Sequence, residues 1–277
     1  MCRRNTVHLI GWLLVALLLS SQSAGAEQER DRFDVLGIRM GDHFDKVRDV
    51  YADHFPPAFT HTVQADLGSI HGTTLRGLSY RAALLGTRIQ LARPPRYNES
   101  PGMEVLFSAP PNEPKAVAIN RQVLLDQPIS AARLRQMLVE KYGPYLVESP
   151  PGPTGGRQRQ REWVLLSWSS DAEGRPQSAR DARHCSSEWV NVGGLRWLRD
   201  RPSGINDGHA RCGFTFVVLM PVGDAITRYS TYVHDANLNR ELNARSIAYS
   251  RAEAERINAE RARQEREALE RAPGPPL

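Results

Sequence analysis

Apolar residues recur at helical spacing in two short segments of the chain. The first segment is His43–His54, and its apolar face consists of Phe44, Val47, Val50 and Tyr51. Asp42 stands before it, where an aspartate can cap a helix, and Pro56-Pro57 stops the helix after it. The pattern predicts a helix over this segment, and the apolar run Phe33–Ile38 before it predicts a short strand.

The second segment begins after Ser130, a typical cap residue, and ends at Gly143-Pro144, a pair typical of a helix C-terminus. Its apolar stripe consists of Ala131, Leu134, Met137 and Leu138. The pattern therefore predicts a second helix between Ser130 and Gly143.

Short apolar runs separated by Gly, Pro, Asn or Ser predict antiparallel strands around these helices. In the first half of the chain they are Phe59–Val63, Arg88–Leu91, Met103–Phe107 and Lys115–Asn120. In the second half they are Tyr145–Glu148, Trp163–Trp168, Gly213–Met220 and Ile226–His234. The turn Pro221–Asp224 predicts that the last two form a hairpin.

Two long segments of the chain do not show the pattern of short strands. Between Ser169 and Arg211, Gly, Asp, Arg and Ser are frequent, so we expect a long loop. From Ala236 onward a helix is expected, with Leu238, Leu242 and Tyr249 on a docked face. Its continuation, Arg251–Arg271, interleaves Ala, Arg and Glu, which predicts a solvated helix.

Each predicted helix follows a short strand and precedes a run of strands. We therefore predict an α+β fold with two helix-plus-antiparallel-sheet units in tandem, residues 27–125 and residues 126–235, the second with long loops. A charged C-terminal helix and tail, residues 236–277, follows. The pattern leaves open whether the two units share one sheet.

The first 26 residues have the three zones of a secretory signal peptide. They comprise a basic start with Arg3 and Arg4, the apolar run Leu9–Leu19, and the cleavage pattern Ala24-Gly25-Ala26. The apolar run is shorter than the ~20 residues of a membrane span. We therefore expect a periplasmic or secreted protein that begins at Glu27 and has no stable membrane insertion.

Two cysteines remain after this segment, Cys185 and Cys212. In an oxidising compartment such a pair is most simply a disulfide. The neighbouring His184 and His209 leave a zinc site as an alternative, although no C-x-x-C spacing is present. We predict the disulfide and no metal site.

Composition narrows the class of protein. The 277 residues are 40% hydrophobic, 24% charged and 7% aromatic, which excludes collagen-like, wholly disordered and polytopic membrane proteins. The net charge of +5 is too small to indicate a nucleic-acid partner.

Two stretches carry a resemblance to a known class of proteins. They are Asp34–Gly41, a Gly-rich strand end that leads into a helix, and Leu134–Pro144, a helix that ends in Lys-Tyr-Gly-Pro. Both are similar to the β-lactamase-inhibitor-protein-like repeats and to small outer-membrane assembly lipoproteins. No lipidated cysteine follows the signal here. Because those proteins are binding modules, the resemblance implies recognition of a protein partner and no catalysis.

The sequence contains clearer candidates for binding residues than for catalytic residues. The chain has no G-x-S-x-G, H-E-x-x-H, P-loop or G-x-G-x-x-G motif. Arg157, Arg159 and Arg161 form the densest basic patch, which could meet an anionic surface or lie in a solvated loop. Trp189 and Trp197, in the irregular region, are the interface candidates among the tryptophans.

The sequence thus favours a non-enzymatic, cofactor-free periplasmic binding or adaptor protein that recognises another envelope protein. One alternative is an envelope hydrolase with its site on the 169–211 loops. A second is metal handling by His184, Cys185, His209 and Cys212.

Overall fold

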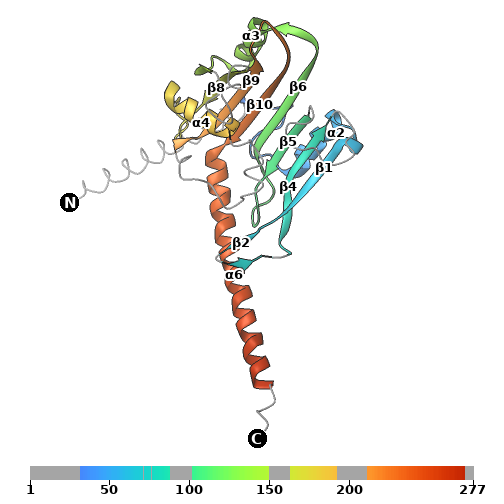
Figure 1. Cartoon of the computed structure of the whole chain (residues 1–277), viewed down its shortest axis with the longest axis vertical. Helices are drawn as coiled ribbons and strands as arrows, with labels where there is room; N and C mark the ends of the chain where they lie inside the picture. Colours follow the sequence, from blue (N-terminus) through green and yellow to red (C-terminus); the bar gives the residue numbers. More distant parts are fainter. Residues whose placement is uncertain are drawn as a thin grey trace, which may run out of the picture.

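A computed structural model describes residues 32–70, 72–75, 77–87, 102–149, 163–191 and 211–271. Its centre is an eight-stranded antiparallel sheet with the order β1-β4-β5-β6-β10-β9-β8-β7 (Figure 1). These strands are β1 (Thr60–Asp66), β4 (Ser79–Thr87), β5 (Gly102–Phe107), β6 (Ala116–Ser130), β7 (Val147–Ser149), β8 (Trp163–Ser169), β9 (Phe214–Pro221) and β10 (Ala225–Asp235). A separate two-stranded sheet pairs β2 (Ser69–Ile70) with β3 (Thr73–Thr74).

The helices are α2 (Phe44–His54), α3 (Ala131–Tyr142), α4 (Ala179–Asn191) and α6 (Ala236–Arg271), with a 3-10 turn η1 (Pro57–Phe59) after α2. These elements show the α+β class that the pattern predicts. The predicted hairpin joins β9 and β10, and the long C-terminal helix is present.

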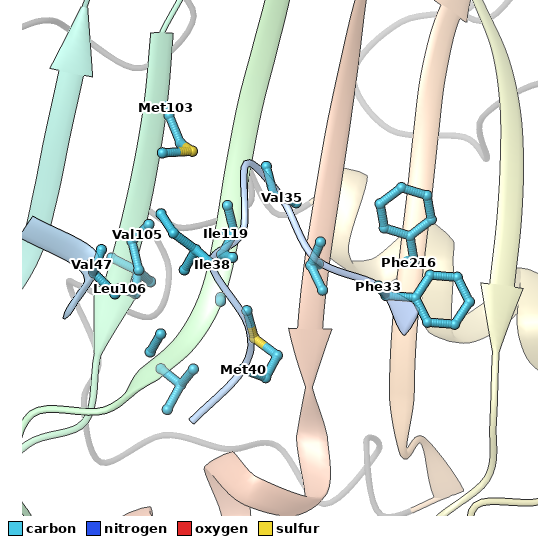
Figure 2. Close-up of a cluster of buried hydrophobic side chains, with 14 of the residues drawn as sticks. Phe33, Val35, Ile38, Met40, Val47, Met103, Val105, Leu106, Ile119 and Phe216 are labelled. Atoms are coloured by element: carbon cyan, nitrogen blue, oxygen red, sulfur yellow. The ribbon is translucent and has the colours of Figure 1, made fainter. Parts of the chain in front are cut away.

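One face of the sheet carries the main hydrophobic core. Helix α2 contributes Phe44, Val47 and Tyr51 to this core, and α3 contributes Leu134, Leu138 and Tyr142. The segment with Phe33, Val35, Ile38 and Met40 runs across several strands on this face (Figure 2). The Phe33 ring lies 5.0 Å from that of Phe214 and 5.3 Å from that of Phe216, centroid to centroid. The segment therefore ties the two halves of the sheet together.

The segment Phe33–Ile38 is not the predicted strand. Val35 and Ile38 exchange two backbone hydrogen bonds of 3.0 Å, and Leu36 and Gly37 between them both have positive φ. This is the backbone of a two-residue turn in which φ is positive at both positions. Its apolar residues enter the core from a turn. Because a buried turn and a buried strand can both be rich in apolar residues, the sequence pattern did not distinguish the two.

Helix α2 approaches the sheet closely at Gly86 of β4. A Cβ atom there would lie 2.7 Å from atoms of the Phe55 ring and 2.9 Å from the Tyr51 ring. The Tyr51 hydroxyl donates a 2.9 Å hydrogen bond to the Leu84 carbonyl of the same strand. The missing side chain at Gly86 thus lets two aromatic rings rest on the strand.

Helix α3 begins and ends as its sequence predicts. The Ser130 hydroxyl accepts a 3.1 Å hydrogen bond from the Arg133 amide, as a cap residue does. Gly143 ends the helix with φ of 73°, a conformation that glycine adopts without strain. At α2, by contrast, the N-cap is His43, and Asp42 accepts a hydrogen bond from the backbone of Arg39.

A polar cluster on the surface links α3 to the short edge strand β7. Arg135 donates to Glu148 at 2.6 and 3.1 Å, and the Tyr145 hydroxyl donates to the same carboxylate at 2.7 Å. Partial burial raises the pKa of Glu148, but these hydrogen bonds and the charge of Arg135 outweigh it, so the pKa lies below its ordinary value. The carboxylate therefore stays ionised in the folded state.

Other strand predictions differ from the structure in their bounds. The strand predicted at Lys115–Asn120 continues to Ser130, with an irregular register opposite Ile226 and Arg228. Pro128 lies in the irregular part of β6, and a proline cannot donate to a regular ladder. The segment Arg88–Leu91 lies outside the described residues, and β4 precedes it.

The expectation of a loop throughout Ser169–Arg211 is wrong, because α4 occupies part of it. Helix α4 lies on the second face of the sheet. Its Ser186 contacts Ser167 of β8, whose side chain points away from the main core that receives Leu166 and Trp168. Side chains alternate between the two faces of the sheet along β8, so its two tryptophans lie on opposite faces. Trp168 joins the main core, and Trp163 packs beside Leu165 and Leu219.

Candidate interaction surface on the C-terminal helix

Helix α6 is the element of the described chain that reaches farthest from the sheet (Figure 1). It begins directly after β10, where the Asp235 carboxylate accepts a 2.8 Å hydrogen bond from the Leu238 amide. An aspartate at this position also interacts favourably with the positive end of the helix dipole. Arg240, in the next turn, donates to the Cys212 carbonyl at 2.9 Å. The start of α6 is thus fixed to the segment that leads into β9.

A second anchor lies one turn further along α6. The Asn112 side chain donates to the carbonyl oxygens of Ala109, at 2.9 Å, and Leu242, at 2.8 Å. The Ser246 hydroxyl donates to the same Ala109 carbonyl at 2.9 Å. These bonds join the loop between β5 and β6 to the helix.

A third anchor is formed by β2, β3 and the flanking residues Leu67, Leu75 and Leu78, which together we call the clasp. Ala254 of α6 and Leu75 of the clasp are buried together in a small hydrophobic cluster. Partly buried residues complete this cluster: Ile70, Leu78, Tyr80, Tyr249 and Ile257. The Asn258 amide donates to the Thr73 hydroxyl at 2.9 Å. The clasp therefore holds α6 as far as Asn258.

Residues 259–271 continue the helix beyond the clasp, and every side chain in this range is exposed. We call this range the exposed end. At 1.5 Å per residue it is about 20 Å long. Leu269, its largest aliphatic side chain, is 75% exposed. The solvated part of the helix begins after Asn258, later than the predicted Arg251, because Ala254 and Ile257 pack against the clasp.

Charged side chains stabilise the exposed end internally. Glu267 lies 3.9 Å from Arg263 and 3.4 Å from Arg271, each one turn away. Such exposed pairs contribute about 0.3–0.5 kcal/mol each. Within the described ranges, Arg261, Arg266, Glu265 and Glu270 have no ion-pair partner. In that part of the chain the exposed end therefore offers unpaired charges of both signs and one isolated leucine.

The interface residues predicted from the sequence mostly lie outside the described ranges. Trp189 belongs to α4, but its side chain is not among those described. Trp197, Arg157, Arg159 and Arg161 also lie outside the described residues. Their role as a binding surface stays a prediction.

The predicted disulfide is present between Cys185 and Cys212, with Cα atoms 5.9 Å apart. It joins α4 to the segment before β9. Both cysteines are buried, with relative exposures of 1% and 0%. Because the bond uses both thiols, the proposed metal set with His184 and His209 loses its sulfur ligands.

Buried hydroxyl groups lie near this disulfide on α4 and β8, and no pattern in the sequence indicates them. Ser186 donates to the Ala182 carbonyl at 2.6 Å and also contacts Ser167. The Ser169 hydroxyl donates to the Gln177 side chain at 2.6 Å. The described residues contain no cluster of three or more His, Cys, Asp or Glu side chains that could hold a metal ion. Hydrogen bonds of β8 with α4 and with Gln177, which precedes α4, account for these serines.

The chain has been compared with protein families, curated proteins and solved structures. No match was found in any of the three. Within the described residues, none of the helices combines the length and the apolarity that a membrane crossing requires.

Proposed function

We propose that this chain is a non-enzymatic binding or adaptor protein of the cell envelope. In this proposal the signal peptide, residues 1–26, is removed, and the mature protein acts in the periplasm. Its sheet comprises two helix-plus-four-strand units, and the exposed end of α6 engages a protein partner. The resemblance to binding repeats motivates the proposal.

The strand order supports the two-unit part of the proposal. Strands β1, β4, β5 and β6 are neighbours in chain order and follow α2. Strands β7, β8, β9 and β10 are likewise neighbours in chain order and follow α3. The two sets meet at their last strands, β6 and β10, as expected for two similar units joined side by side.

The observation that carries the binding function is the exposed end of α6. The helix is anchored at three places as far as Asn258, so its continuation does not have to nucleate on its own. A partner would therefore meet a helix that is already ordered, which reduces the entropic cost of association. Of the unpaired side chains, Arg261 and Arg266 favour acidic groups on the partner surface, whereas Glu265 and Glu270 favour basic ones.

Truncation separates binding from folding only if the clasp contacts are retained. A cut after Ser250 removes Ala254, Ile257 and Asn258, all of which contact the clasp. A cut after Ala259 removes residues 260–271, all of the exposed end but its first residue, and no side chain that is buried in the clasp. We expect the second truncation to unfold within about 1 °C of the full chain, because exposed helix ends contribute little stability.

The partner is identified by photo-cross-linking in intact cells. A photoreactive side chain is placed at Leu269 in the exposed end, and at Gln64, exposed on β1, as the matched control. The cross-linked protein is then purified and tested for binding to the full chain and to the chain cut after Ala259. The proposal predicts a specific adduct at Leu269 and a loss of affinity of at least about 100-fold on truncation.

The proposal is wrong if the adducts at the two positions are the same, or if the truncated chain binds the purified protein with full affinity. An adduct at Leu269 that needs the whole exposed end for binding supports it. A negatively charged variant, Arg261→Glu with Arg266→Glu, should weaken the same interaction without changing the unfolding temperature.

A further inference from the structure

A small cleft lies between α6 and the ends of β4, β5 and β6, on the anchored part of the helix. Its volume is about 40 Å³. The walls are apolar and aromatic on the side of the sheet, with Tyr80, Ala82, Leu106, Phe107 and Val117 among them. Helix α6 contributes Asn239, Leu242, Asn243 and Ser246. The residues that line the cleft carry no charged side chain.

Among the residues that line this cleft, Asn243 indicates most clearly what kind of group the cleft could bind. It is 9% exposed, so nine-tenths of it is buried, and it lines the cleft. Its carboxamide makes no hydrogen bond within the part of the chain that the structure describes. Its polar atoms are not fully enclosed, in contrast to the Asn120 side-chain oxygen. The carboxamide is therefore open to water or to a ligand that enters the cleft.

Two further polar groups in the cleft share this property. Asn239, one turn before Asn243 on the same side of α6, also lines the cleft without a hydrogen bond in the described ranges. Burial raises the pKa of Tyr80, which keeps its hydroxyl protonated and able to donate. In contrast, the Ser246 hydroxyl is already bonded to the Ala109 carbonyl. Three neutral polar groups thus remain for a ligand.

The chemistry of these groups selects the ligand. A carboxamide presents a donor and an acceptor side by side, which complements another amide. A charged ligand would lose its hydration without gaining a counter-charge in this cleft. A volume of about 40 Å³ holds a group of a few atoms and no sugar ring. We propose that the cleft binds an uncharged secondary amide group, through hydrogen bonds to Asn239 and Asn243.

Such an amide occurs both in N-acetylated sugars and in peptides, and the experiment distinguishes the two sources. The folded full-length chain is titrated with N-acetylglucosamine, and separately with N-acetylalanine methylamide, while the side-chain amide signals of Asn239 and Asn243 are followed by NMR. Glucose, which lacks the amide, and acetate, which is charged, are the negative controls. We expect saturable shifts of both asparagine signals with at least one of the two amides.

The variant Asn243→Asp removes the donor while preserving the shape of the side chain. It should weaken binding at least about tenfold, the effect of losing one hydrogen bond. Gln264→Glu makes the same chemical change at an exposed position of the same helix and should leave binding unchanged. If Asn243→Asp impairs folding, Asn239→Asp serves in its place, since Asn239 is only partly buried.

Three outcomes would overturn the proposal: no saturable shift with either amide, equal shifts with glucose, or full binding by the aspartate variant. A response to the sugar alone identifies an acetamido sugar as the ligand class. A response to the peptide analogue alone identifies a peptide group. Neither result depends on the exposed end of α6, so this proposal and the proposed function fail separately.

Discussion

Ile257 and Leu269 are aliphatic residues of similar size on the same helix, in opposite surroundings. Ile257 packs against the clasp, whereas Leu269 is 75% exposed. Ile257→Ala removes three carbon atoms, each worth about 0.8 kcal/mol when fully buried. Because Ile257 is only partly buried, we expect a loss of about 1–1.5 kcal/mol in the free energy of unfolding.

Leu269→Ala provides the matched control. It removes exposed carbon atoms and introduces the residue with the highest helix propensity, so we expect a change within about 0.5 kcal/mol. For a domain of this size, about 1 kcal/mol corresponds to roughly 2–4 °C in the unfolding temperature. The expected difference between the two variants is therefore about 3–5 °C.

The assay is equilibrium unfolding in urea, followed by tryptophan fluorescence and by circular dichroism. The midpoint should fall for Ile257→Ala at an unchanged slope and stay constant for Leu269→Ala. Equal losses in the two variants would refute the assignment of the anchored and exposed parts of α6. No loss in either would show that the clasp adds nothing to stability.

Three further perturbations test other parts of the fold. Gly86→Ala should cost about 1–3 kcal/mol in urea unfolding, because its Cβ would lie 2.7 Å from the Phe55 ring. Replacing Cys185 and Cys212 together by alanine should lower the free energy of unfolding by about 2–4 kcal/mol, and a reducing agent should do the same to the native protein but not to the variant. The folded-state pKa of Glu148 is lowered, so its contribution to stability is present above pH 4.5, its ordinary pKa, and is lost as the pH falls. The native protein should therefore be more stable than Glu148→Gln by at most about 0.5 kcal/mol at neutral pH. This difference should vanish in acid.

The sequence predicted those elements whose signals are local. Ser130 and Gly143 bound α3 because a hydroxyl cap and a glycine C-cap act within a few residues. It missed β4, in which Ala82, Ala83 and Leu84 lack the β-branched character of a typical strand. Such a strand forms because its neighbours pair with it, which the chain pattern does not reveal.

Helix α4 was missed for a different reason. Among its described side chains the buried ones are the small residues Ala182, Cys185 and Ser186, which do not form the large aliphatic stripe of a typical amphipathic helix. One local signal did exist: Ser178 accepts a 3.2 Å hydrogen bond from the Asp181 amide and donates to its carboxylate at 2.6 Å. This reciprocal cap, with serine and an acidic residue three positions later, could have indicated the helix.

The candidate site combines a predictable part and an unpredictable part. Charge interleaving indicated that the end of α6 is solvated, but it could not indicate where the docked part stops. That boundary depends on Thr73, which bonds to Asn258 across a separation of 185 residues. The cleft at Asn243 likewise needs strands from the first half of the chain beside a helix from its end. Contacts of this kind arise from the folded topology and leave no periodic trace.

Folding and partner binding draw on different parts of the same helix. Up to Asn258, α6 is held by buried side chains and hydrogen bonds from the sheet, a loop and the clasp. In the exposed end, helical order rests on ion pairs worth a few tenths of a kcal/mol each, in addition to the backbone bonds. Substitutions in the exposed end can therefore change affinity while the unfolding temperature stays constant. Substitutions in the anchored part should mainly lower stability. They should change affinity only indirectly, by altering the position of the exposed end.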